Sequence, residues 1–111
     1  MITFEEIPLL TNFDNPVSLE EKGVGDKSSK VHYFDLMDED GAVKDSYSTV
    51  AGDLTVVYST SNIISFNIPL AIVNLLTLNE YYYGDLKRID TTENFICRIK
   101  FKVQEGYSDS P

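Results

Sequence analysis

Apolar and polar side chains alternate most regularly near the C-terminal end of the sequence. The odd positions from 95 to 103 are apolar, and the even positions from 98 to 102 are cationic. This period of two predicts a strand with one face in the core and one in water. A register slip of one residue would bury all of the cations, so the register is strongly constrained. The apolar positions are Phe95, Cys97, Ile99, Phe101 and Val103, and the cationic ones are Arg98, Lys100 and Lys102.

Two further pairs of strands are predicted in the middle of the chain. Residues 31–36 are rich in aromatic and β-branched side chains, and residues 42–50 follow them after the acidic turn at 38–41. This arrangement is typical of an antiparallel hairpin. Residues 54–58 and 63–68 flank a short polar stretch in the same way, so they predict a second hairpin.

The pattern changes at Pro69, a residue that is favourable in the first turn of a helix and unfavourable inside a strand. Apolar side chains then recur at helical spacing, with Asn67 placed to cap the helix and Gly84 placed to end it. We therefore expect a main helix over residues 68–82, and a strand that continues through Leu70 is the alternative. The residues at helical spacing are Ile68, Ala71, Ile72, Leu75, Leu76, and Leu78 or Tyr82.

A short helical turn is expected near the N-terminus. Residues 16–22 are mostly polar, and Ser18 and Glu21 have the spacing of a capping box. Gly23 would end this turn within a flexible loop over residues 22–30. Together, these elements predict an α+β domain, in which an antiparallel sheet of about four to six strands accompanies one main helix and the N-terminal helical turn.

The chain has 111 residues and is expected to form a single domain, residues 1–111, with a polar C-terminal tail over residues 105–111. No apolar run approaches the roughly eighteen residues of a membrane helix. The first residues also lack the features of a secretion signal. The single cysteine, Cys97, cannot form an internal disulfide, which favours folding in a reducing compartment. We therefore expect a cytoplasmic protein that does not bind membranes.

Acidic residues are concentrated in the N-terminal half. The formal net charge is −9, and residues 1–53 hold twelve acidic and four basic side chains. This half is expected to repel nucleic acid and to attract basic protein surfaces. Acidity that only keeps a small protein soluble is the simpler alternative.

This charge predicts a non-enzymatic, acidic protein-binding module. Such a module could act as an inhibitor that occupies a basic, nucleic-acid-binding surface of its protein partner by charge mimicry. The candidate acidic contacts are Glu20, Glu21, Asp26, Asp35, Asp38, Glu39, Asp40 and Asp45.

The cationic face of residues 98–102 is the feature that most favours nucleic acid. However, Phe95 and Phe101 are expected on the opposite face of that strand, whereas base stacking needs aromatic rings beside the cations. We therefore expect no direct contact with nucleic acid. The partners expected for these cations are acidic side chains of a neighbouring strand, such as Asp45 or Asp53.

Three consecutive tyrosines, Tyr81, Tyr82 and Tyr83, lie at the expected end of the main helix. Successive residues of a helix point about 100° apart, so at least one of these rings should be exposed. Tyrosine is enriched in protein interfaces. The alternative function is therefore a small structural or assembly subunit that pairs through edge strands and this tyrosine patch. The partner's identity and the oligomeric state are left open by the sequence.

No motif for phosphate or calcium binding is complete. The stretch GVGDKSS at 23–29 has the lysine of a phosphate-binding loop, but Asp26 and Glu21 stand where that loop needs glycines. In the acidic turn, Leu36 and Tyr47 stand where an EF-hand needs carboxylates. We therefore expect no metal and no cofactor.

Nucleophilic catalysis is also not expected. Histidine and cysteine each occur once, at His32 and Cys97. Cys97 is predicted on the buried face of its strand, where a thiol behaves as a small hydrophobic group. The sequence therefore indicates no enzymatic site.

Overall fold

A computed structural model describes residues 2–3 and 6–106 of the chain, so most of the expected tail over 105–111 lies outside the described residues. The described part contains nine strands and a single turn of helix. The strands are β1 (Ile2–Thr3), β2 (Ile7–Leu10), β3 (Asn15–Glu21), β4 (Val31–Met37), β5 (Val43–Ser48), β6 (Leu54–Tyr58), β7 (Asn62–Ile68), β8 (Tyr81–Ile89) and β9 (Glu93–Gln104), and the helix is α1 (Leu70–Val73).

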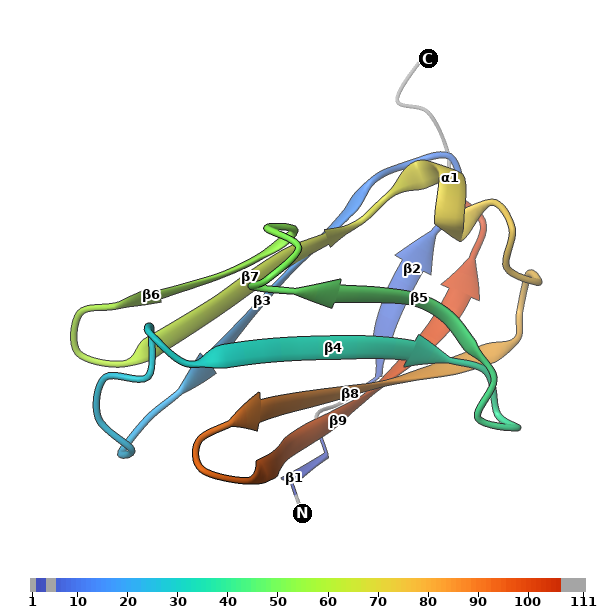
Figure 1. Ribbon diagram of the computed structural model, residues 1–111. Helices are drawn as coiled ribbons and strands as arrows, with labels where there is room; N and C mark the ends of the chain where they lie inside the picture. The colour runs from blue at the N-terminus through green and yellow to red at the C-terminus, as the bar shows by residue number, and fades with distance from the viewer. Residues whose placement is uncertain (1, 4–5, 107–111) are drawn as a thin grey trace.

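The strands form two sheets that pack as the layers of a half-barrel (Figure 1). The larger sheet has the order β1-β9-β8-β4-β5, and β2 also pairs with β9. The smaller sheet has the order β3-β7-β6. All neighbours are antiparallel except β1 and β2, which run parallel to β9.

The expectation of an α+β domain is therefore wrong, because the chain is nearly all β. The main helix expected over residues 68–82 is reduced to Leu70–Val73, and Tyr81 already begins β8. A helix this short gains little from its own hydrogen bonds. The three tyrosines instead pair with β9, and Tyr83 also pairs with Met37 of β4, so this segment is held in the larger sheet.

The expected N-terminal helical turn over residues 16–22 is also wrong. Residues 16–21 of this segment lie in β3, which pairs with β7 over its whole length. Val17 and Leu19 are buried, whereas Ser18 and Glu20 are exposed. The segment thus has the period of two of a strand, and the spacing of Ser18 and Glu21 is not used as a capping box.

The other strand predictions are largely confirmed. β4 pairs with β5 and β6 pairs with β7 as antiparallel hairpins. In β9, the burial alternates as expected from Cys97 to Val103. Phe95 is the exception, because a bulge opposite Leu86 and Lys87 inserts one residue in β9 and turns the Phe95 ring outward, where it is 39% exposed.

Aromatic rings form the centre of the core between the two sheets. Phe34 is fully buried, and its ring centroid lies 4.4 Å from that of Phe66, 6.2 Å from that of Phe101 and 6.4 Å from that of Tyr47. These rings come from both sheets. The core therefore joins the layers through contacts between strands that are distant in the sequence.

Candidate functional site

The acidic turn that joins β4 to β5 is built around one carboxylate. Oδ1 of Asp38 accepts hydrogen bonds of 2.9 Å from the backbone N–H groups of Asp40 and Ala42. The bond from Ala42 is the main reason that the pKa of Asp38 is lowered. Asp38 thus holds the turn, and the side chains of Glu39 and Asp40 are left exposed to solvent.

The three tyrosines lie on a strand rather than on a helix, so their rings alternate between the two faces of the larger sheet. Tyr82 is buried, and its hydroxyl oxygen accepts a 2.9 Å hydrogen bond from the backbone N–H of Thr77. Tyr81 and Tyr83 are half-buried on the outer face. Only these two remain candidates for contact with a partner.

The structure brings the acidic turn and the tyrosines together, although they are far apart in the sequence. A shallow hollow of about 200 Å³ is lined by Asp38, Glu39, Asp40, Glu80, Tyr81 and Tyr82. A second hollow of about 410 Å³ lies beside it, between the turn on one side and Tyr83 and Arg98 on the other. We call Glu39, Asp40, Glu80, Tyr81 and Tyr83 the acidic end of the molecule.

The cations of β9 lie on the same outer face as these tyrosines. Nζ of Lys100 lies 4.3 Å from the ring centroid of Tyr81, and Nζ of Lys102 lies 5.6 Å from it. Cζ of Arg98 lies 6.0 Å from the ring centroid of Tyr83. These distances are within the range of cation–π contacts, so the cations hold the two rings in place.

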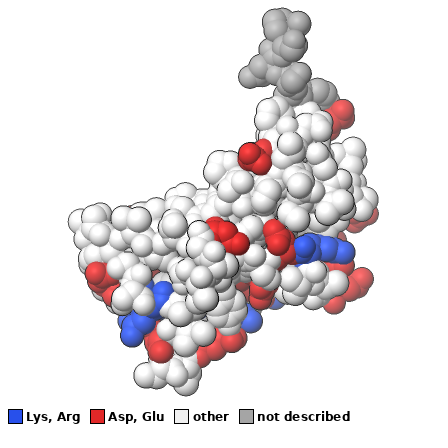
Figure 2. Space-filling view, turned by 45° about the horizontal axis from the view of Figure 1, so that its top comes forward, with Lys and Arg blue, Asp and Glu red and all other residues white. Residues whose placement is uncertain are grey.

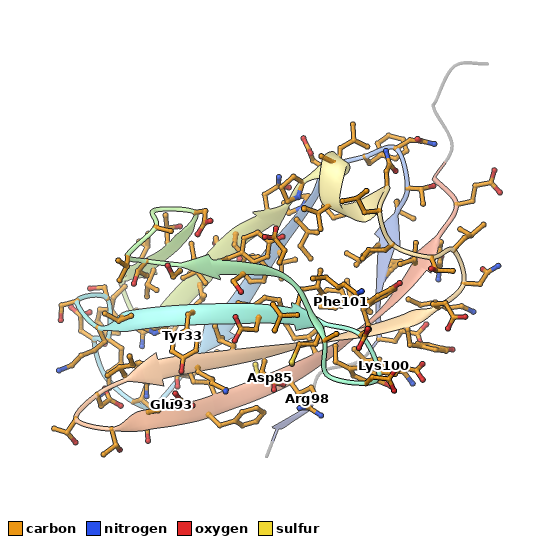
Figure 3. All side chains as sticks on the ribbon, turned by 45° about the vertical axis from the view of Figure 1, so that its right-hand side comes forward. Tyr33, Asp85, Glu93, Arg98, Lys100 and Phe101 are labelled. Atoms are coloured by element: carbon orange, nitrogen blue, oxygen red, sulfur yellow. The ribbon has the colours of Figure 1, made fainter. Side chains whose placement is uncertain are left out.

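Arg98 of the cationic strand pairs with Asp85 of the neighbouring strand β8, so an acidic partner on a neighbouring strand is confirmed, but the residues named for it, Asp45 and Asp53, are wrong. Arg98 donates two hydrogen bonds to the Asp85 carboxylate, of 2.7 and 2.9 Å, which raise the pKa of Arg98 (Figure 3). Asp53 instead accepts a hydrogen bond from the backbone N–H of Ser48.

Two other acidic residues that were predicted to contact a partner lie in the strands of the β4–β5 hairpin rather than in its turn. Asp35 is opposite Asp85 on the outer face, and its Oδ1 accepts a 2.7 Å hydrogen bond from Ser46 Oγ. Asp45 accepts a hydrogen bond from the backbone N–H of Ser46. Both carboxylates are half-buried, so they are less accessible to a partner than Glu39 and Asp40.

The remaining predicted acidic contacts lie elsewhere. Glu20 and Glu21 end β3 in the smaller sheet, and Asp26 lies in the loop before β4, at the opposite end of that strand from the acidic turn. Figure 2 shows acidic side chains spread over one face rather than gathered in a single block. The eight predicted acidic residues thus belong to several surfaces of the molecule.

The loop over residues 22–30 is anchored to the smaller sheet, and its flexibility stays a prediction. The buried Asn62 side chain donates to the carbonyl of Gly25 at 2.7 Å and accepts from the N–H of Lys27 at 2.9 Å. Asp26 accepts hydrogen bonds from the N–H and Oγ of Ser28. The loop's C=O of Gly25, N–H of Lys27 and carboxylate of Asp26 thus form hydrogen bonds within the protein.

A groove that sequence reasoning missed opens between β3 and the β8–β9 hairpin, with a volume of about 420 Å³. Its floor is apolar and consists of Leu19, Ile64, Leu86, Ile96 and Cys97. These residues come from four strands of both sheets, so no local pattern in the sequence could have revealed the groove.

One end of the groove contains charged side chains. Arg88 is buried, and it donates hydrogen bonds of 2.5 Å to Glu21 and 3.2 Å to Asp90. His32 is fully buried nearby in the core, where desolvation lowers its pKa. Nε2 of His32 has no hydrogen-bond partner among the described residues.

The single cysteine is not placed for chemistry. Cys97 is 2% exposed, and burial raises the pKa of its thiol to about 12.

Within the described residues, no group of three or more His, Cys, Asp or Glu side chains could hold a metal ion. No helix in this part of the chain is long and apolar enough to span a membrane.

Comparison with known proteins supports the fold. No known family and no curated protein matches the chain. Among solved structures, the periplasmic chaperone SfaE is similar with a TM-score of 0.50 at 9% sequence identity. The similarity covers 96% of this chain and 56% of the chaperone chain, so our chain spans little more than half the length of that protein.

Proposed function

We propose that this protein is a non-enzymatic module that binds a protein partner through its acidic end. The observation that carries the proposal is the meeting of the β4–β5 turn with Glu80, Tyr81 and Tyr83 around shared hollows. Exposed carboxylates attract a basic segment from a distance, and the tyrosine rings supply apolar contact area once it has docked.

The partner chemistry follows from the groups that remain exposed. Glu39, Asp40 and Glu80 are exposed, whereas Asp38 is occupied in holding the turn. A lysine- or arginine-rich segment of a protein partner is the complementary ligand, and the net charge of −9 favours its approach. Inhibition of a nucleic-acid-binding partner by charge mimicry, in the cytoplasm, remains the sequence-based prediction for the biological role.

The test compares two variants with the same change in net charge. Glu39→Gln/Asp40→Asn removes two negative charges from the acidic end. Ser29→Lys/Val50→Lys adds two positive charges far from the acidic turn. Ser29 lies just before β4 and Val50 just after β5, and both are exposed. We expect the first variant to weaken binding of an oligo-arginine peptide about tenfold at low salt, and the second to weaken it much less.

Nuclear magnetic resonance and a pull-down complete this test. Chemical shift changes caused by the peptide should map to Glu39, Asp40, Glu80, Tyr81 and Tyr83. A partner captured from native lysate at low salt should be lost both at high salt and with the first variant. Equal loss with the two variants would mean that only the net charge matters, and the proposed site would then be wrong.

The assembly subunit remains the second candidate, because β3 leaves an unpaired edge in the described structure. Since Tyr82 is in the core, the variants that test a tyrosine interface are Tyr81→Ala and Tyr83→Ala. A concentration-dependent oligomer in light scattering that dissociates in these variants and responds little to salt would favour assembly over the acidic end.

A further inference from the structure

The groove between β3 and the β8–β9 hairpin lies apart from the acidic end. Its apolar floor is flanked by two hydrophobic side chains of the rim, Val24 and Phe95, which are 40% and 39% exposed. We propose that this groove binds an extended segment of a protein partner, which adds to β3 as a strand and alternates apolar residues with lysine or arginine. This site goes beyond the proposed function.

The backbone of β3 supplies the hydrogen-bonding groups for such a strand. Pro16 is opposite Asn67 in the register and has no N–H, so its nitrogen faces away from β7. In an antiparallel pair, the residues two and four positions further along face the same way, so Ser18 and Glu20 direct their N–H and C=O groups to the free edge. The 3.5 Å approach of Ser18 Oγ to Ser65 Oγ fits this register, because side chains are closest in pairs without backbone hydrogen bonds.

Within the described residues, no strand occupies this edge of β3. On the opposite wall, the pairing of β9 with the described residues of β1 begins at Cys97. Phe95 and Ile96 therefore border the groove from β9, and Leu19 borders it from β3. An unpaired edge beside an apolar groove is the arrangement to which extended peptides bind by strand addition.

The register of an added strand determines its chemistry. Side chains on its inner face would lie beside Val17 and Leu19 and enter the groove, so they should be apolar. Side chains on its outer face would lie beside Ser18 and Glu20. The Glu20 side chain is 45% exposed. Its Oε2 accepts a 2.5 Å hydrogen bond from Ser61 Oγ, which lowers the pKa of Glu20, and its Oε1 lies 3.6 Å from Nζ of the exposed Lys22. The carboxylate stays negatively charged in these contacts, so a lysine or arginine of the partner is complementary there.

The proposal can be tested with a defined peptide of the same length as β3. The probe is Lys-Val-Lys-Val-Lys-Val-Lys, and the readout is hydrogen exchange of single backbone amides in the wild-type protein. We expect saturating peptide to slow exchange at Ser18 and Glu20 by about tenfold or more, because these amides gain acceptors. The control peptide Lys-Val-Lys-Pro-Lys-Val-Lys should protect them much less, since proline interrupts a strand ladder.

A matched pair of variants tests the free edge itself. Ser18→Pro removes an N–H that faces away from β7, and Ser18→Ala retains it. We expect Ser18→Pro to weaken peptide binding about tenfold, equivalent to about 1.4 kcal/mol, and Ser18→Ala to change it little. If Ser18→Pro does not fold, amide protection in the wild type decides the question alone.

Several results would overturn the proposal. These are no binding of the peptide, binding without protection at Ser18 and Glu20, or equal binding of Glu-Val-Glu-Val-Glu-Val-Glu. Protection that rises with protein concentration without peptide would identify a second copy as the occupant and would also contradict it. Glu39→Gln/Asp40→Asn should leave the protection unchanged, so failure of this site and failure of the acidic end are distinguishable.

Discussion

Gly84 in β8 is the position where a single methyl group should do the most damage to the core. A Cβ at this position would lie 1.8 Å from Cζ of Phe34, and 2.5 and 2.6 Å from its two Cε atoms. The φ angle of Gly84 is not in the left-handed region, so alanine would not strain the backbone. Gly84→Ala therefore tests only the space that the Phe34 ring occupies.

The size of the effect follows from the surroundings of that ring. Phe34 is fully buried and packs against Phe66, with 4.4 Å between the ring centroids. Overpacking a core typically costs about 1–3 kcal/mol. Losing a buried phenylalanine costs about 3–5 kcal/mol. A contact of 1.8 Å forces the ring out of its place, so we expect Gly84→Ala to lower the free energy of unfolding by about 3 kcal/mol.

Urea denaturation followed by circular dichroism measures this change. The control is Phe34→Leu, which shortens the clashing side chain and should cost about 1–2 kcal/mol on its own. In the double variant, Gly84→Ala should add less than about 1 kcal/mol, because the ring is already gone. If Gly84→Ala costs less than about 0.5 kcal/mol, or if the two costs simply add, the clash with Phe34 is not the reason for glycine at this position.

The remaining predictions concern the alternation in β9 and the buried histidine. Phe101→Asp should unfold the domain in thermal melts, because it buries an unpaired charge. Lys100→Glu on the outer face should lower the melting temperature little. Equal loss of stability in the two variants would contradict the alternation. Burial lowers the pKa of His32 from 6.5, so the unfolded state binds a proton first as the pH falls below that value. The free energy of unfolding should then fall by up to about 1.4 kcal/mol per pH unit as the pH falls below about 6.5, and His32→Leu should lack this part of the slope.

The sequence by itself determined the elements whose signal is local. The alternation from Cys97 to Val103 predicted which face of β9 is buried, because a period of two leaves a single register that keeps the cations in water. The polar turns at 38–41 and 59–62 predicted the two hairpins, because their strands are also neighbours in the chain. Two local features escaped this reasoning: the bulge in β9 that turns Phe95 outward, and the period of two in β3, where a helical turn was expected.

Tertiary structure decided the elements whose partners are distant in the chain. Residues 68–82 have helical spacing, but the end of this range, Tyr81 and Tyr82, pairs with β9, and the Tyr82 ring is buried in the core. The same pairing brings Tyr81 and Tyr83 beside the acidic turn. The groove likewise depends on the packing of two sheets. Helical or strand periodicity reports which side of a segment is apolar, and it carries no information about which distant strand will cover that side.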